Sequence, residues 1–164
     1  MENNPAHFTV IKDTREQKGY YFGKTDRGKC NGMIEEKLDT GDYSLVGFED
    51  KICVERKASV EEIATNLGQK KHAFIREMER MSVFPHRFIV LEFDLQDVLD
   101  FPNHKDSRIP EAKRKSTRMS SSYIMKCLAE FQTIYGINIL FCGNKHNAFL
   151  AVTSIFKRIN EIYN

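Results

Sequence analysis

The sequence lacks the segments that would place the chain in or across a membrane. No apolar run approaches the roughly 20 residues that span a bilayer, and the polar stretch 1–5 has no signal-peptide core. The four cysteines have no close spacing, which indicates neither a zinc motif nor a disulfide framework. We therefore expect a soluble intracellular protein, in the cytoplasm or nucleoid, or in the nucleus of a eukaryotic or viral host, with reduced and mostly buried cysteines.

Two common kinds of active site are also missing. The five histidines are scattered and form no pair with metal-ligand spacing, so no zinc constellation is predicted. The sequence has no glycine-rich phosphate loop, so nothing indicates nucleotide hydrolysis. It also contains no internal repeat and no low-complexity tract.

What is present fits one globular domain that covers residues 1–164. A chain of 164 residues can bury a real core, and 41% hydrophobic with 29% charged residues is ordinary for a soluble globular protein. The net charge of +2 is too small to indicate nucleic-acid binding by itself, so the distribution of charge matters more.

A β-hairpin is predicted over residues 41–57. Two apolar runs, 43–46 and 52–54, are separated by the short polar stretch 47–51 and preceded by a Gly-Asp turn. Glu55 and Lys57 are two residues apart on the second strand, so they share one face, and Asp42 begins the first strand. The hairpin thus predicts two hard oxygen ligands for Mg²⁺ beside an ammonium, a set that suits phosphodiester hydrolysis. On spacing alone, a turn aspartate and a solvated strand end are the simpler explanation.

The rest of the pattern predicts an α/β protein with a sheet flanked by helices. Strands are expected at 8–13, 34–38, 87–93 and 137–142, and residues 17–33 are expected to form an exposed loop. A capping box at Ser59 begins a helix, a second follows near 70–81, and a third at 123–135 has Ile134 on its apolar face. A final helix runs from Asn147 to the end.

The stretch 102–122 is predicted to be a basic, flexible loop. It holds more cations than acids, namely Lys105, Arg108, Lys113, Arg114, Lys115 and Arg118 against Asp106 and Glu111. Flexible basic segments commonly contact phosphates. A solubilising loop explains the composition equally well.

Three motifs together resemble the nuclease signature of the XPF-type structure-specific endonucleases. That signature combines Gly-Asp with a later Glu-Arg-Lys, three residues and an acid, and the chain has 41–42, 55–57 and Glu61 in these places. The run 12–16, Lys-Asp-Thr-Arg-Glu, is similar to that family's Asp-x-Arg-Glu strand end. The resemblance covers the whole chain and is greatest to the compact single-domain members. Glu61 departs from the usual Asp, and nothing resembles the tandem helix-hairpin-helix domain of larger relatives.

The resemblance implies the restriction-endonuclease-like core of the PD-(D/E)XK superfamily, with a central mixed sheet flanked by helices. Asp42 and Glu55 would then ligate Mg²⁺ or Mn²⁺, Lys57 would orient or help deprotonate the attacking water, and Asp13 and Glu61 would be supporting carboxylates. Arg15 and Arg56 would contact the scissile phosphate or position neighbours. Further basic residues would lie near the DNA, namely Lys70, Lys71, Arg76, Lys113, Arg114, Lys115 and Arg118.

The leading hypothesis is a metal-dependent DNA endonuclease that acts on branched, flap or fork DNA in repair, recombination or replication. The alternatives are a non-catalytic DNA-binding pseudonuclease and a sequence-specific restriction-type endonuclease. The presence of Asp42, Glu55 and Lys57 favours an enzyme over a pseudonuclease.

The resemblance also implies a homodimer that pairs through C-terminal helices. Independently, the last helix has more apolar residues than one stripe requires, namely Phe149, Val152, Ile155, Phe156, Ile159, Ile162 and Tyr163. Deep burial of this helix within its own domain is the alternative.

Overall fold

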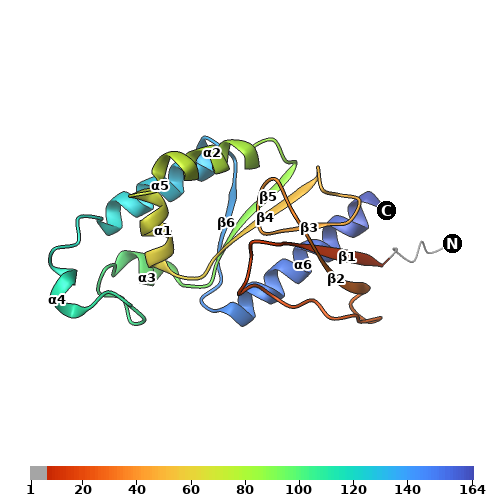
Figure 1. Cartoon of the computed structure of the whole chain (residues 1–164), viewed down its shortest axis with the longest axis horizontal. Helices are drawn as coiled ribbons and strands as arrows, with labels where there is room; N and C mark the ends of the chain where they lie inside the picture. Colours follow the sequence, from red (N-terminus) through yellow and green to blue (C-terminus); the bar gives the residue numbers. More distant parts are fainter. Residues whose placement is uncertain (1–6) are drawn as a thin grey trace.

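A six-stranded mixed sheet organises the computed structural model in Figure 1, which describes residues 7–164. The strands lie in the order β2-β1-β3-β4-β5-β6. Strand β3 is antiparallel to β1 and β4, and the other neighbours are parallel. The predicted α/β class, with a mixed sheet flanked by helices, is confirmed. The strands are β1 (Phe8–Asp13), β2 (Cys30–Glu36), β3 (Tyr43–Leu45), β4 (Ile52–Lys57), β5 (His86–Leu91) and β6 (Asn138–Phe141).

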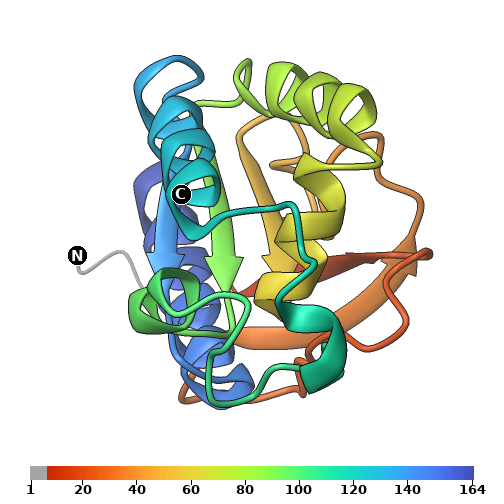
Figure 2. The same ribbon diagram turned by 90° about the vertical axis from the view of Figure 1, so that its left-hand side faces the viewer.

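Helices cover both faces of this sheet, with α1, α2 and α5 on one face and α6 on the other (Figures 1 and 2). The first helix begins as predicted, because the Ser59 hydroxyl accepts the N–H of Glu62 at 3.2 Å. No helix within residues 7–164 is both long and apolar enough to cross a membrane. The helices are α1 (Val60–Leu67), α2 (Lys71–Met81), α3 (Leu95–Leu99), α4 (Glu111–Arg114), α5 (Ser121–Thr133) and α6 (Lys145–Tyr163).

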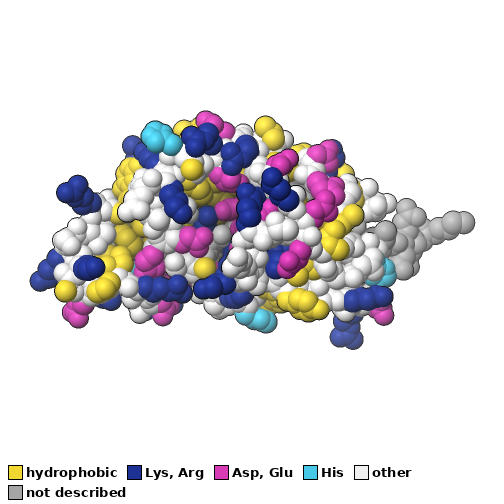
Figure 3. Space-filling view, viewed as in Figure 1, with side chains coloured by type: hydrophobic (Ala, Val, Ile, Leu, Met, Phe, Trp, Pro, Cys, Tyr) yellow, Lys and Arg dark blue, Asp and Glu magenta, His cyan; other side chains and the backbone are white. Residues whose placement is uncertain are grey.

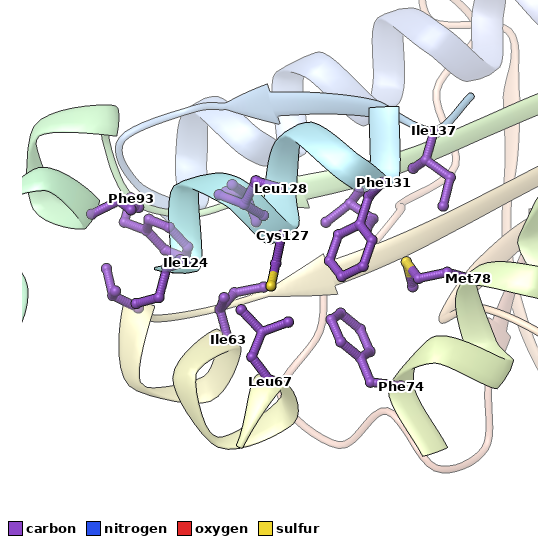
Figure 4. Close-up of a cluster of buried hydrophobic side chains, with 14 of the residues drawn as sticks. Ile63, Leu67, Phe74, Met78, Phe93, Ile124, Cys127, Leu128, Phe131 and Ile137 are labelled. Atoms are coloured by element: carbon purple, nitrogen blue, oxygen red, sulfur yellow. The ribbon is translucent and has the colours of Figure 1, made fainter. Parts of the chain in front are cut away.

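The alternation of side chains along β4 and β5 divides the core into two layers. Cys53 and Ile89 point into the cluster beneath α1, α2 and α5, part of which is shown in Figure 4. Val54 and Val90 point into the second cluster, beneath α6. Because alternate residues of a strand share a face, Glu55 and Lys57 continue the face of Cys53, toward α1 and α2.

The predicted exposed loop at 17–33 is wrong in two respects. Tyr20 and Phe22 are buried, each with 3% of its surface exposed, and they pack on α6 through Phe149 and Phe156. Strand β2 also begins inside this stretch, at Cys30. The glycines and lysines dominated the composition, but two aromatic side chains are enough to fix the segment against α6.

The prediction that Ile134 lies on the apolar face of its helix is wrong. Helix α5 ends at Thr133, so Ile134 is the C-terminal capping residue and 68% of it is exposed. The buried face of α5 consists instead of Ile124, Cys127, Leu128 and Phe131.

The apolar residues of α6 serve mainly the core of the same chain. Val152, Phe156 and Ile159 are buried against the sheet, and Phe149 and Ile155 pack at the edge of the same cluster. Only the last turn leaves a considerable part of its apolar surface exposed, at Ile162 (51%) and Tyr163 (37%).

The basic stretch 102–122 is tied to the rest of the fold at several points. It contains the short helix α4. His104 is buried, and Ile109 and Met119 pack against the first cluster. Elsewhere three of the cysteines are buried and Cys142 is half-buried, in line with the predicted burial.

Phe131 in α5 and the capping residue Ile134 offer a matched test of this packing. Phe131 is fully buried and meets the Phe74 ring edge-to-face, with centroids 5.3 Å apart. We expect Phe131→Ala to lower the free energy of unfolding by about 3–5 kcal/mol, whereas Ile134→Ala should change it by less than about 0.5 kcal/mol. Urea denaturation measures both, and equal unfolding midpoints would contradict the arrangement described here.

Candidate active site

Acidic side chains gather where the ends of β1, β3 and β4 meet. Asp13 ends β1, Asp42 directly precedes β3, and Glu55 and Lys57 lie at the end of β4. Because β3 pairs with both β1 and β4, these ends lie side by side. The structure thus brings Asp42, Glu55 and Lys57 together as the hairpin predicted. They share a cavity of about 350 Å³ lined by Asp13, Arg15, Glu16, Gly41, Asp42, Glu55, Arg56, Lys57, Glu62 and Glu77.

The backbone fixes Asp42 between two strands. Its N–H donates to the carbonyl of Val54 at 2.8 Å, and its own carbonyl accepts the N–H of Asp13 at 2.8 Å. Gly41 precedes it with a φ of +79°, and a Cβ there would lie 2.6 Å from Cys53 Sγ and 3.1 Å from the Val54 oxygen. Only glycine fits this turn without strain.

The Asp42 carboxylate lies in an unfavourable place for a negative charge. Burial raises its pKa well above the usual range, and the nearby charge of Glu55 raises it further. The backbone N–H of Arg56 donates to Asp42 Oδ2 at 2.7 Å and opposes these effects only in part.

Glu55 and Lys57 form a buried ion pair, with Lys57 Nζ 2.7 Å from Glu55 Oε1. Burial raises the pKa of Glu55, against the opposing charge and hydrogen bond of Lys57. Burial alone would lower the pKa of Lys57, but the charge and hydrogen bond of Glu55 raise it overall. Lys57 is therefore an ammonium, and its Nζ also lies 3.7 Å from Glu62 Oε1.

The cavity has more negative charge than its own cations neutralise. Arg15 donates to both oxygens of Asp13, at 2.7 and 3.0 Å, and Arg56 pairs with Glu16 at 3.5 Å. Lys57 is then the remaining cation among those that line the cavity, facing four further carboxylates. These are Asp42, Glu55, Glu62 and Glu77, of which Glu77 is also paired with Arg80, outside the cavity. Such an excess fits a divalent cation.

The side chains of the cavity fit Mg²⁺ or Mn²⁺ if waters and backbone carbonyls supply the remaining ligands. Within residues 7–164 no three His, Cys, Asp or Glu side chains form a ready-made ligand group. Asp42 and Glu55 supply two carboxylates, and Mg²⁺ is usually bound through one or two carboxylates while it keeps several waters. The residues present therefore fit the metal that the hairpin motif predicts.

Two acids of the cavity, Glu62 and Glu77, were not assigned from the sequence. Glu77 comes from α2, and its Oε1 accepts the N–H of Gly41 at 3.1 Å. It follows the buried Phe74 by three residues, so it lies on the same face of the helix. An acidic residue on the otherwise apolar face of this helix is the sequence signal that could have identified Glu77 as a site residue.

The family of the chain follows from its sequence. The model of the ERCC4 domain family matches residues 13–154. The chain belongs to the ERCC4 domain family. This membership supports a DNA nuclease, in agreement with the hairpin motif. No curated protein matches the chain.

Solved structures show the same fold as this ERCC4 domain. XPF from Aeropyrum pernix matches with a TM-score of 0.61 and 20% identity, over 92% of this chain and 60% of that one. XPF from Aeropyrum pernix in complex with DNA matches with a TM-score of 0.60 and 20% identity, over 96% of this chain and 67% of that one. This ERCC4 domain thus spans 60% of the length of the first of these structures.

The structure does not bring Glu61 into the carboxylate cavity of this ERCC4 domain. Glu61 Oε1 accepts the backbone N–H of Arg108 at 2.8 Å and lies 3.1 Å from Nε2 of the buried His104. Adjacent residues of a helix point about 100° apart, so Glu62 faces the cavity while Glu61 faces the stretch 102–108.

The predicted DNA-binding arginines near the cavity are engaged by acids. Arg56 is buried and donates to both oxygens of Glu92, at 2.5 and 3.0 Å. Burial lowers its pKa, yet pairing with Glu92 raises it overall. These contacts suit the positioning of neighbours, one of the two roles that the resemblance implies for Arg56. Arg15 pairs with Asp13, although 65% of its side chain is exposed.

The other predicted DNA-binding residues lie outside the carboxylate cavity. Arg114 is half-buried and donates to the carbonyl of Ile109 at 2.9 Å. Lys71 donates to the Tyr123 hydroxyl at 2.7 Å. The exposed members of the set are Lys70, Lys71, Arg76, Lys113, Lys115 and Arg118.

Asp13 and Asp42 line the same cavity but should respond oppositely to loss of charge. The raised pKa of Asp42 means that its ionised form costs stability at neutral pH. The pKa of Asp13 is lowered, because hydrogen bonds from Arg15 and Leu38 outweigh burial, so its ionised form contributes stability. In EDTA at pH 7.5, Asp42→Asn should raise the Tm and Asp13→Asn should lower it. Each kcal/mol corresponds to about 2–4 °C for a protein of this size.

The gain from Asp42→Asn should shrink as the pH is lowered, because the wild-type carboxyl then takes up a proton and loses its charge. Added Mg²⁺ should raise the Tm of the wild type and leave that of Asp42→Asn unchanged, since ligand binding stabilises only a protein that binds it. Thermal melts measure both effects. A lower Tm for Asp42→Asn than for the wild type would contradict the electrostatics given above.

Proposed function

We propose that this ERCC4 domain is a metal-dependent DNA endonuclease. The observation that carries the proposal is the cavity in which Asp42 and Glu55 lie beside Lys57 with an excess of negative charge. A protein that kept the fold only as a scaffold would have no reason to retain two carboxylates whose burial raises their pKa.

Asp42 and Glu55 would hold Mg²⁺ or Mn²⁺. Arg56 N–H occupies one oxygen of Asp42, and Lys57 occupies one oxygen of Glu55. Each carboxylate thus keeps a second oxygen for a ligand. When bound, the metal supplies neutralisation of the phosphate charge and a water of lowered pKa.

Lys57 acts as a fixed positive charge in this proposal. Its raised pKa and its ion pair with Glu55 keep the side chain protonated, which suits stabilisation of the charge that develops on a phosphate. The same pair makes Lys57 a poor proton acceptor. Asp13 holds Arg15 at the rim, and Glu62 and Glu77 set the orientation of Lys57 and of the Gly41 turn.

The substrate proposed is branched DNA, such as flaps and forks. The family match supports DNA as the substrate, and one of the similar structures is an XPF in complex with DNA. A role in repair, recombination or replication would follow from such a substrate.

A cleavage assay tests the proposal. The protein is incubated with Mg²⁺ or Mn²⁺ and labelled flaps, forks, bubbles, duplex and single strand. Asp42→Asn and Glu55→Gln should each lower the cleavage rate at least about 100-fold, more than loss of an outer-shell partner costs. Glu130→Gln, on the outer surface of α5, is the matched control and should cleave normally.

Full activity of either variant, or full activity in excess EDTA, would refute the metal assignment. Binding of DNA without cleavage by the wild type would identify a pseudonuclease. Cleavage of one defined duplex sequence only would identify a restriction-type endonuclease.

We also propose that the domain pairs as a homodimer. The exposed apolar side chain of Ile162 in the last turn of α6 supports a contact there. Ile162→Asp should therefore lower the sedimentation coefficient at micromolar concentration and keep the folded circular dichroism spectrum of the wild type. Phe156→Asp, in the core of the same helix, should instead unfold the chain. A wild type that sediments as a monomer would refute the homodimer.

A further inference from the structure

A second hollow, the outer groove, adjoins the carboxylate cavity and has a volume of about 760 Å³. Arg15, Glu16, Arg56 and Glu62 line both spaces, so the two lie side by side at the rim of the cavity. The walls that the cavity does not share include three cations, namely Lys18, Arg108 and Lys145.

These three cations are not neutralised within residues 7–164. No ion pair engages the side chains of Lys18 and Arg108 in that part of the chain. Lys145 Nζ donates to the carbonyl of Lys18 at 2.6 Å, and a neutral carbonyl leaves the ammonium charge in place.

Four acids also line the outer groove. Glu16 and Glu92 pair with Arg56, whereas Glu61 and Glu62 accept the backbone N–H groups of Arg108 and Ala58, which leave their charges in place. The walls that the cavity does not share therefore carry three cations against Glu61 and the paired Glu92, so they present positive charge next to a cavity that presents negative charge. A phosphate chain that reaches the cavity would find its counter-charges along the outer groove.

Three distant segments build this surface and are held together by hydrogen bonds. Lys18 follows β1, Arg108 belongs to the basic stretch 102–122, and Lys145 begins α6. The contact of Lys145 with the Lys18 carbonyl joins two of them, and Glu61 fixes the backbone of the third to α1. Figure 3 shows Lys and Arg side chains on this face of the molecule, over the region where α6 begins in Figure 1.

We propose that the outer groove binds the phosphates of a single DNA strand that extends from the carboxylate cavity. This inference rests on the proposed nuclease function. The volume lies within the about 300–1,000 Å³ of sites for single small ligands, which suits a few nucleotides of one strand and is too small to enclose a duplex. Among residues 7–164 no aromatic side chain lines the outer groove, so binding follows the phosphates and does not depend on base sequence.

Glu61 is a positioning residue for the outer groove. Its carboxylate holds the backbone of Arg108 at 2.8 Å, so it determines where the guanidinium is presented. Glu61 would therefore act on the bound strand through Arg108. This role replaces the supporting role in the cavity that is expected from the sequence.

The test measures binding without cleavage, by fluorescence anisotropy in EDTA with a labelled oligo-dT and a hairpin duplex across a range of salt. Combining Lys18→Gln, Arg108→Gln and Lys145→Gln removes three phosphate contacts. The slope of log K against log salt should fall by about 2 on the single strand and stay unchanged on the duplex. The matched control combines Lys24→Gln, Lys126→Gln and Arg158→Gln, all exposed and outside the groove, and should keep the wild-type slope.

Glu61 provides a second, graded test. Glu61→Ala should lower the single-strand slope by as much as Arg108→Gln alone, about 0.7. Glu61→Gln keeps an oxygen that accepts the Arg108 N–H, so it should restore the wild-type slope. A wild-type slope in Glu61→Ala would show that Glu61 does not position Arg108 for binding.

The inference is overturned by an unchanged single-strand slope in the triple variant, by an equal loss on duplex, or by a wild type that binds no single strand at low salt. Because the assay contains no metal, its outcome is separate from that of the nuclease proposal. If the protein cleaves DNA but the binding test fails, only the proposed strand-binding role of the outer groove is rejected. If the binding test succeeds but the protein never cleaves DNA, only the proposed nuclease activity is rejected.

Discussion

Two backbone hydrogen bonds of Asp42 decide where the chemistry of this protein can occur. One joins Asp42 to β4 and the other joins it to the end of β1, so a single residue sets the register of three strands at their ends. The turn at Gly41 makes this possible, because its positive φ and the nearby Cys53 leave no space for a side chain. Because these bonds join Asp42 to Asp13 itself and to Val54, the residue before Glu55, they also bring Asp13, Glu55 and Lys57 close to Asp42.

The charges at this point are arranged at a cost to the folded state. Buried carboxylates are destabilising unless they are fully paired. Asp13 is buried and fully paired, through Arg15 and Leu38. The half-buried Asp42 accepts one hydrogen bond within residues 7–164, from the Arg56 N–H, and is repelled by Glu55. The cavity therefore holds Asp13 with both oxygens engaged beside Asp42 with one oxygen left for a ligand. That contrast is what separates a structural acid from one that is ready for a ligand.

Local patterns made most of the fold and part of the site predictable from the sequence. Period-two alternation gave the hairpin, and it placed Glu55 and Lys57 on one side. The same alternation puts Arg56 on the opposite face, toward Tyr20, where it is buried with Glu92. That consequence could have been drawn from the strand alone.

Other features depend on packing between distant elements, which no local pattern records. Glu77 reaches the cavity only because α2 packs beside the hairpin turn. The choice between Glu61 and Glu62 is decided by the direction in which α1 leaves β4. The aromatic residues at 20 and 22 are buried because α6 returns over them from the far end of the chain.

Arg56 has a mechanical consequence. Its guanidinium links Glu16, just beyond β1, with Glu92, just beyond β5, across the end of β4. The rim of the cavity is thus braced from strand to strand, and it cannot widen without breaking buried ion pairs. Under the proposed function the DNA, and not the protein, must then bend to bring a phosphate to the carboxylates. Bending is easiest where base stacking is already interrupted, so a stiff protein would by itself select DNA that contains a flexible joint.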